Sequence, residues 1–197
     1  ARPEISRPAG SENMTQREKS CILNELSPPI EVLNPARQTV PLVFSSPHSG
    51  RIYPTTLLDA TRLTLQQLRR SEDFAIDELF APVVGLGAPL LAARFPRVYV
   101  DVNREPYELD PELFNGRLPD FANTQSARVV GGLGTIARVV ADTEEIYRER
   151  LPIGAAFERI ERLYRPFHEA LAGLLEATRK RFGIAVLIDC HSMPSAS

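Results

Sequence analysis

Two of the three histidines in the chain follow apolar runs that are typical of β-strands. His48 comes after the run at residues 40–44, and His191 comes after the run at residues 184–188. In open α/β sheets, ligands bind beyond the carboxyl ends of the strands, so side chains that follow two strands can converge there. Neutral imidazole is a frequent zinc ligand, and a catalytic zinc site needs three protein ligands and one open position. The two histidines therefore predict part of a metal site.

The third ligand has to come from another part of the chain. A His-x-x-Glu pair is absent, because Arg51 occupies the position where that motif needs a glutamate. An acidic segment follows Ser71, which can cap a helix, and Asp73 and Asp77 would share one face of that helix. Acidic residues in the first turn of a helix also interact favourably with the helix dipole, and they do so without binding a ligand. Glu72, Asp73 and Asp77 therefore stay open as candidates.

The other residues with reactive side chains have simpler explanations. Adjacent residues of a strand point to opposite faces, so Cys190 and His191 are not expected to form a nucleophile pair, and Cys190 is expected to be a small buried residue. Asp189 shares the face of His191 and is placed to orient its ring. His168 lies beside the apolar stripe of a predicted helix, where a partly buried, hydrogen-bonded role is expected.

A second polar cluster lies in the segment 97–104, where polar residues alternate with valines. The polar residues on its one face are Arg97, Tyr99, Asp101 and Asn103. Polar groups at the end of a half-buried strand need partners or a ligand. Arg104, beside Asn103, is able to hold a carboxylate in bidentate fashion, and a surface ion pair is the alternative explanation.

The elements that must position these residues alternate between strand and helix patterns. Strands are predicted over residues 40–44, 89–95, 98–102 and 184–188, and the last is typical of a fully buried strand. Helices are predicted to begin near residues 71 and 144. Apolar residues at steps of three and four between Phe157 and Thr178 predict a long helix, which Pro166 should kink or split and Gly183 should end. Strands separated by helices predict an α/β fold with three layers and a mostly parallel or mixed sheet.

The composition restricts the class of protein further. The 197 residues are 43% hydrophobic and 24% charged, as in ordinary globular domains. A net charge of −2 gives no electrostatic reason to expect nucleic acid binding, and no apolar run is long enough to predict a membrane span. Two cysteines without a paired motif favour the cytoplasm. Residues 1–37 are polar and rich in proline, which predicts a flexible tail that allows one short helix around residues 16–26, before a domain at residues 38–197.

Four segments, taken together, resemble the N-formylglutamate amidohydrolase family. The first is Ser-Pro-His-Ser-Gly at 46–50 with Tyr53 and Pro54, and the second is Glu72 and Asp73 followed by Ile76, Asp77 and Leu79. The third is Asp-Val-Asn-Arg at 101–104, and the fourth is Asp-Cys-His-Ser-Met at 189–193. Arg-Pro-Phe-His at 165–168 is also similar to the family. The resemblance covers about residues 40–195. It implies a zinc-dependent amidohydrolase with a carboxypeptidase/phosphorylase-like fold, which hydrolyses a small N-acyl amino acid such as N-formylglutamate to formate and glutamate.

The resemblance also implies roles for single residues. The metal ligands that it implies are His48, Asp73 and His191. Asn103 and Arg104 would bind the carboxylate of a small acidic substrate, as a similar pair does in aspartoacylase-like relatives. The catalytic glutamate of the family lies well after the second histidine motif, so it is expected beyond Ser197 and no catalytic residue is assigned. We therefore expect a family member truncated at its C-terminus, which binds zinc and turns over poorly.

Two alternative functions stay open. The first is a zinc amidase that acts on a peptide or a cell-wall amide, which would not need the carboxylate clamp at Arg104. The second is a non-catalytic domain that binds a small acidic ligand, which the missing glutamate favours. Stoichiometric metal would argue against this second alternative.

Overall fold

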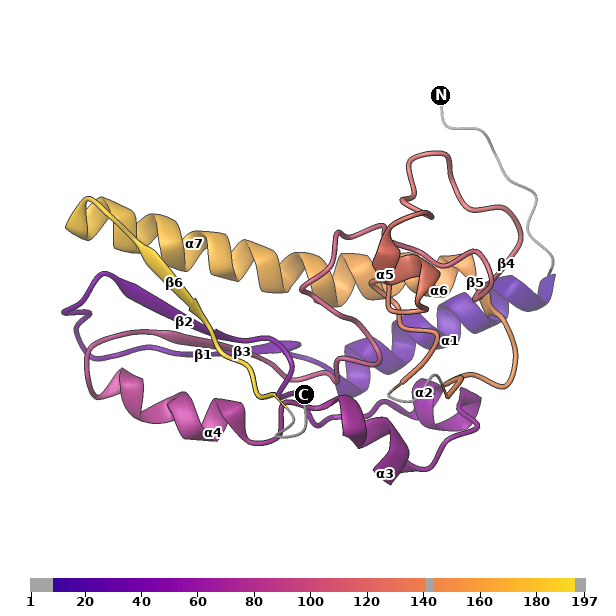
Figure 1. The fold of residues 1–197 in the computed structure, drawn as a ribbon, viewed down its shortest axis with the longest axis horizontal. Coiled ribbons are helices and arrows are strands. Elements are labelled where there is room, and N and C mark those ends of the chain that lie inside the picture. The colour runs from indigo at the N-terminus through magenta and orange to yellow at the C-terminus, as the bar shows by residue number, and fades with distance from the viewer. Residues whose placement is uncertain (1–8, 141–143, 194–197) are drawn as a thin grey trace.

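The computed structural model describes residues 9–140 and 144–193, and its main sheet has four strands, which lie toward one end of the fold (Figure 1). The strands, β1 (Ile30–Leu33), β2 (Leu42–Ser46), β3 (Leu90–Ala93) and β6 (Val186–Asp189), lie in the order β1-β3-β2-β6. Strand β2 is parallel to both β3 and β6, whereas β1 is antiparallel to β3. The predicted mixed, mostly parallel sheet is confirmed.

Helices cover both faces of this sheet and complete three layers. The α-helices are α1 (Ala9–Glu25), α2 (Thr55–Ala60), α3 (Leu65–Leu68), α4 (Ile76–Phe80), α5 (Ala127–Val130), α6 (Ile153–Arg159) and α7 (Arg165–Phe182). Short 3-10 helices are η1 (Arg69–Ser71) and η2 (Ala81–Val84), and a small second sheet pairs β4 (Phe114–Asn115) with β5 (Leu151–Pro152). Helix α7 packs on one face of the main sheet and α4 on the other (Figure 1). No helix in the described ranges is both long and apolar enough to cross a membrane.

The predicted long helix exists, with a local irregularity where proline was expected to disturb it. A π-helical turn, η4 (Ile160–Tyr164), joins α6 to α7, and Pro166 lies in the first turn of α7. The π-helical turn directly before Pro166 accommodates its ring and its missing N–H, so the chain stays helical through this point. The helix ends at Gly183, as predicted, in the left-handed conformation with φ of 82°.

The predicted flexible tail is wrong for the described residues 9–37. Helix α1 buries Ile22 in the core, Leu26 directly after the helix is buried there as well, and strand β1 pairs with β3. Glu18 of α1 forms a buried ion pair with Arg159 of α6. The prolines of this segment lie mainly between the two elements, so a high proline content here marks the connections rather than disorder.

The segment 98–102, predicted as a strand, has no strand conformation. Its residues are almost fully buried, but the backbone turns: Tyr99 N–H donates to the carbonyl of Pro96 and Asp101 N–H to the carbonyl of Thr135. Alternation of polar and apolar residues indicates which side chains are buried, and it does not fix the partners of the backbone.

Three other predictions need correction. Strand β6 lies at the edge of the sheet, and about 40% of Val186 and Leu187 is exposed, so it is not a fully buried strand. The helix predicted from Ser71 begins only at Ile76, after Ala75 in the left-handed region with φ of 57°. Residues 144–150 are irregular and pair through isolated bridges instead of forming a helix.

Candidate metal centre

The two histidine motifs lie at the carboxyl ends of adjacent parallel strands. Strands β2 and β6 pair with Ser45 opposite Asp189, and the N–H of Cys190 continues the ladder by donating to the carbonyl of Ser45. His48 and His191 follow these strands, and the centroids of their rings are 5.0 Å apart. The sheet therefore brings together two residues that are 143 positions apart in the chain.

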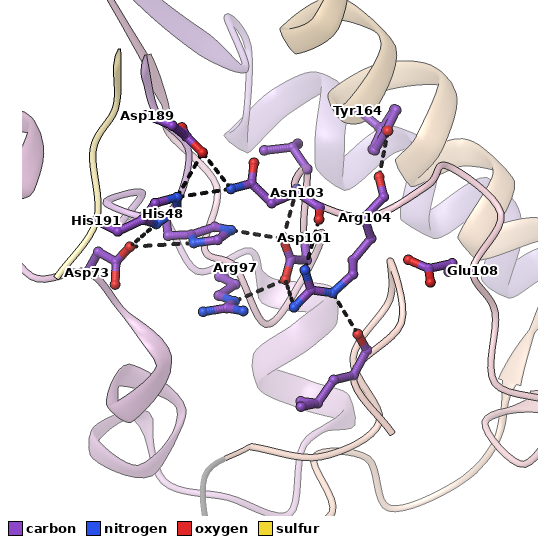
Figure 2. A network of polar contacts seen from close by, with 12 residues as sticks. His48, Asp73, Arg97, Asp101, Asn103, Arg104, Glu108, Tyr164, Asp189 and His191 are labelled. Carbon is purple, nitrogen blue, oxygen red and sulfur yellow. Dashed lines mark hydrogen bonds and ion pairs between the residues drawn. The ribbon is translucent and has the colours of Figure 1, made fainter. Parts of the chain in front are cut away.

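Asp73 completes a cluster of three potential metal ligands. The backbone N–H of Asp73 donates to the carbonyl of His48 at 3.1 Å, which fixes the loop before α4 against the end of β2. One ligand atom each from His48, Asp73 and His191 can be chosen so that all three lie within 4.8 Å of one another (Figure 2). The predicted ligands are thus brought together by the fold.

The polar contacts inside the cluster leave one buried nitrogen without a partner. Asp73 Oδ2 is 2.7 Å from His191 Nδ1 but 3.5 Å from His48 Nδ1, which is too long for a good hydrogen bond. His48 is 2% exposed, and its Nδ1 is a buried atom without a hydrogen-bond partner. A buried polar atom without a partner is costly, and a metal ion between these groups would satisfy it. The donor set of two imidazoles and one carboxylate fits a zinc ion.

The Nε2 atom of each histidine contacts a further aspartate. Asp101 Oδ1 is 2.8 Å from His48 Nε2, and Asp189 Oδ2 is 2.9 Å from His191 Nε2 (Figure 2). A carboxylate in this position fixes the ring and its tautomer, so that the Nδ1 atoms are available as ligands. The orienting role expected for Asp189 agrees with this geometry, whereas the contact of Asp101 with His48 had not been predicted.

The electrostatics of the cluster keep its carboxylates ionised. Burial raises the pKa of Asp73, but contacts with His48 and His191 outweigh it and lower the pKa to about 2. Burial also raises the pKa of Asp101, but His48 and the nearby arginines lower it well below its ordinary value. The pKa of His191 is raised, because Asp189 and Asp73 outweigh the effect of burial. A cationic ligand suits such a concentration of negative charge.

The loop that carries His48 is fixed by close backbone packing. A Cβ atom added to Gly50 would lie 2.0 Å from the carbonyl oxygen of Phe95, so only glycine allows this approach. The hydroxyls of Ser46 and Ser49 are hydrogen-bonded to each other, and Ser49 Oγ accepts from the N–H of Asp77 at 3.2 Å. These contacts join the loop to the start of α4 and so keep His48 and Asp73 together.

The competing acidic ligands point to other partners. Glu72 accepts a hydrogen bond from the hydroxyl of Tyr53 at 2.7 Å and from Arg69 at 3.1 Å. Asp77 forms an ion pair with Arg51 at 2.8 Å. Neither belongs to the cluster, so the geometry favours Asp73 among the three candidates.

Two residues with reactive side chains have the structural roles that were expected of them. Cys190 is 2% exposed, and burial raises the pKa of its thiol to about 11, which suits a core residue rather than a nucleophile. His168 Nε2 is 2.9 Å from the carbonyl of Val102, and its ring lies against Tyr164, which agrees with a partly buried, hydrogen-bonded role.

The predicted substrate-binding pair lies at the rim of the centre. Asn103 Nδ2 donates to Asp189 at 2.9 Å and is 3.0 Å from His191 Nε2. Arg104 is only 11% exposed, and all three of its nitrogens have partners: the carbonyls of Asn103 and Leu133, and the carboxylate of Asp101. Binding of a carboxylate by Asn103 and Arg104 stays a prediction.

The fold and this cluster define an α/β protein with a candidate metal centre at the carboxyl ends of its parallel strands. Residues 40–197 match the family model of N-formylglutamate amidohydrolase. The chain is 32% identical, over 170 and 169 residues, to N-formylglutamate deformylases from Pseudomonas putida and Pseudomonas aeruginosa. The chain therefore belongs to the N-formylglutamate amidohydrolase family, and its two Pseudomonas relatives are hydrolases by name.

Solved structures agree with this assignment. The chain is similar to an N-formylglutamate amidohydrolase from Ralstonia eutropha JMP134, with 36% identity and a TM-score of 0.78 over 84% of this chain and 58% of the other. A gene product of Agrobacterium tumefaciens shares the fold, with 20% identity and a TM-score of 0.56. The aligned region covers 84% of this chain and 56% of each curated relative, so the chain spans little more than half of their length.

Proposed function

We propose that this chain carries the metal centre of an enzyme that hydrolyses N-formylglutamate to formate and glutamate. The observation that carries the proposal is the convergence of His48, Asp73 and His191 at the strand ends of a chain that belongs to this family. The substrate follows from relatives that are named N-formylglutamate deformylase. A small acidic molecule in the cytoplasm is accordingly the proposed substrate, with no nucleic acid or membrane partner.

Zinc is the metal that we propose for this centre. His48 and His191 would bind it through Nδ1, and Asp73 through its carboxylate, because these atoms face one another. A zinc ion held there would polarise the formyl carbonyl and lower the pKa of a water molecule towards neutrality. Imidazole and carboxylate ligands also suit other divalent ions, so the identity of the metal is part of the proposal.

The protein groups around the centre would position the ligands and the substrate. Asp101 and Asp189 hold the Nε2 atoms of the two histidines and so fix the direction of Nδ1. Asn103, at the exposed rim, would donate a hydrogen bond to the substrate after its hydrogen bond to Asp189 is broken. Arg104 would either hold Asp101 in place or bind the α-carboxylate of the substrate together with Asn103. We assign no residue that transfers a proton to the leaving nitrogen in the described part of the chain. The family resemblance implies that a glutamate transfers this proton.

Formate release from N-formylglutamate tests the proposal. The chain is loaded with zinc, and formate is measured with and without a chelator, beside His48→Ala as the control. The proposal predicts slow formate release, because no proton-shuttling residue is assigned in the described part of the chain, and the chelator and the substitution should both abolish it. Formate release that is unaffected by either would exclude the centre as the site of the reaction.

A further inference from the structure

A cavity of about 350 Å³ lies next to the metal centre, on the far side of Asp101. Asp101 connects the two places: Oδ1 contacts His48 Nε2 at 2.8 Å, and Oδ2 accepts from Arg97 Nε at 3.0 Å. Arg97 and Asp101 both line the cavity, and Figure 2 shows them beside His48. The volume lies in the range of small-molecule sites, which is about 300–1,000 Å³.

The cavity combines apolar walls with positive charge. The residues that form its walls include Val98, Val139 and Val140, together with Gly131, Leu133 and Gly134 of the glycine-rich loop. Among the described residues that line it, the charged ones are Arg70, which is ion-paired with Glu144 at 3.6 Å, Arg97 and Asp101. Asp101 is already engaged by His48, Arg97 and Arg104, so its charge is compensated within the protein.

Arg97 has donors that its contacts do not use. Its Nε is bound to Asp101, and the structure gives Nη1 and Nη2 no partner within residues 9–140 and 144–193. The side chain is 32% exposed, so the two amino groups are accessible. The end of a guanidinium group presents two parallel N–H bonds, and this arrangement matches a carboxylate.

We infer that this cavity binds the side-chain carboxylate of the substrate, with Arg97 as the residue that selects an acidic side chain. The inference rests on the proposed function, because N-formylglutamate carries a second carboxylate that Asn103 and Arg104 do not account for. Two methylene groups separate this carboxylate from the α-carbon, and the apolar walls suit them. Arg104, whose nitrogens are all engaged, is left for the α-carboxylate or for support of Asp101.

Comparison of an acidic ligand with its neutral isostere tests the inference. Calorimetric titration of the zinc-loaded chain measures the affinity for N-formylglutamate and for N-formylglutamine, and the zinc content of the same samples is determined. Wild type should bind N-formylglutamate at least ~10-fold more tightly, as a charged hydrogen bond contributes about 1.5–3 kcal/mol. Arg97→Met should remove this preference and leave the affinity for N-formylglutamine within about threefold, while Arg97→Lys should keep part of the preference.

Arg117→Met is the matched control, because Arg117 is 86% exposed and pairs with Asp120 outside the cavity. It should leave the preference for N-formylglutamate unchanged. Three results would overturn the inference: no preference in wild type, no binding of either ligand, or an equal loss of both affinities in Arg97→Met. The last result would give Arg97 a role at the reacting carbonyl instead.

Failure of the proposed function and failure of the carboxylate site give different experimental results. A chain that holds no zinc, but loses its preference for N-formylglutamate in Arg97→Met, would refute the function and retain the carboxylate site. A chain that holds zinc and releases formate from N-formylglutamate and N-formylglutamine equally well would retain the function and refute the site.

Discussion

At the scale of single residues, the centre consists of two layers of side chains. The inner layer of two histidines and one aspartate offers N and O ligands, and Asp101 and Asp189 fix the histidines from outside. The unpartnered Nδ1 of His48 is the most informative atom, because proteins rarely leave such a group buried without a reason. The surroundings of His48 thus point to a ligand rather than to a structural histidine.

Substitution of Asp101 tests the outer layer of the centre. Asp101→Asn keeps the shape of the side chain but removes the charge that holds His48 Nε2 and fixes its tautomer. We expect the affinity for zinc to fall about 10–100-fold, as is typical for such partners of metal ligands. Competition with a chromophoric chelator measures this affinity.

Asp110→Asn is the control for this substitution. Asp110 is also buried and is bound to an arginine, Arg138, at 2.6 Å, but it does not contact the proposed ligands. It should lower stability and leave zinc affinity unchanged. Equal zinc affinities for wild type and Asp101→Asn would show that the contact with His48 does not support the site.

At the scale of elements, the sheet register and one glycine set the position of His48. Strands β2 and β6 are paired so that both histidine motifs begin at the same level, and Gly50 lets the loop pack on the backbone of Phe95. A side chain at position 50 would have to displace backbone, which cannot move as a flexible side chain can.

Gly50→Ala should therefore disturb both the fold and the site. The new Cβ atom would meet the Phe95 carbonyl oxygen at 2.0 Å, and overpacking of this kind costs about 1–3 kcal/mol or more of unfolding free energy. Gly173→Ala is the control: nothing lies within 4 Å of the added atom in α7, and alanine should stabilise the helix by about 0.5–1 kcal/mol. Urea unfolding measures both, and a Gly50→Ala chain as stable as wild type would contradict this packing.

The elements show why sequence patterns predicted some features and missed others. The turns after β2 and β6 were predictable because an apolar run followed by Pro, Gly or a polar cluster is a local signal. The segment 98–102 was mispredicted because the alternation of polar and apolar residues indicates only which side chains are buried. One of its backbone hydrogen-bond partners is the carbonyl of Thr135, which no local pattern identifies. The Asp101–His48 contact was missed for the same reason.

At the scale of the whole molecule, a buried ion pair connects α1 to the rest of the domain. Arg159 is 1% exposed, forms an ion pair with Glu18, donates to the Tyr147 hydroxyl at 2.8 Å and lies over the ring of Tyr99. The polar composition of residues 1–37 did not indicate that α1 is attached to the domain, because one buried acidic residue and a few apolar residues are enough to attach a helix. The three-layer fold itself was predictable from the alternation of strands and helices.

Removal of one partner of this ion pair tests the attachment of α1. Arg159→Met should lower the unfolding free energy by about 3–5 kcal/mol, because Glu18 would be left as an uncompensated buried charge. Arg179→Met, in an exposed pair with Glu176, should leave the unfolding midpoint unchanged. Thermal and urea unfolding measure both, and equal midpoints for the two variants would mean that α1 is not held by this pair.

The central claim is that His48, Asp73 and His191 form one metal site, and the metal content of the purified chain tests it most directly. Elemental analysis after incubation with zinc and desalting should find about one zinc ion per chain in wild type, and none in His48→Ala or His191→Ala with unchanged circular dichroism. A folded wild-type chain without zinc, or histidine variants that keep the full zinc content of wild type, would contradict the account.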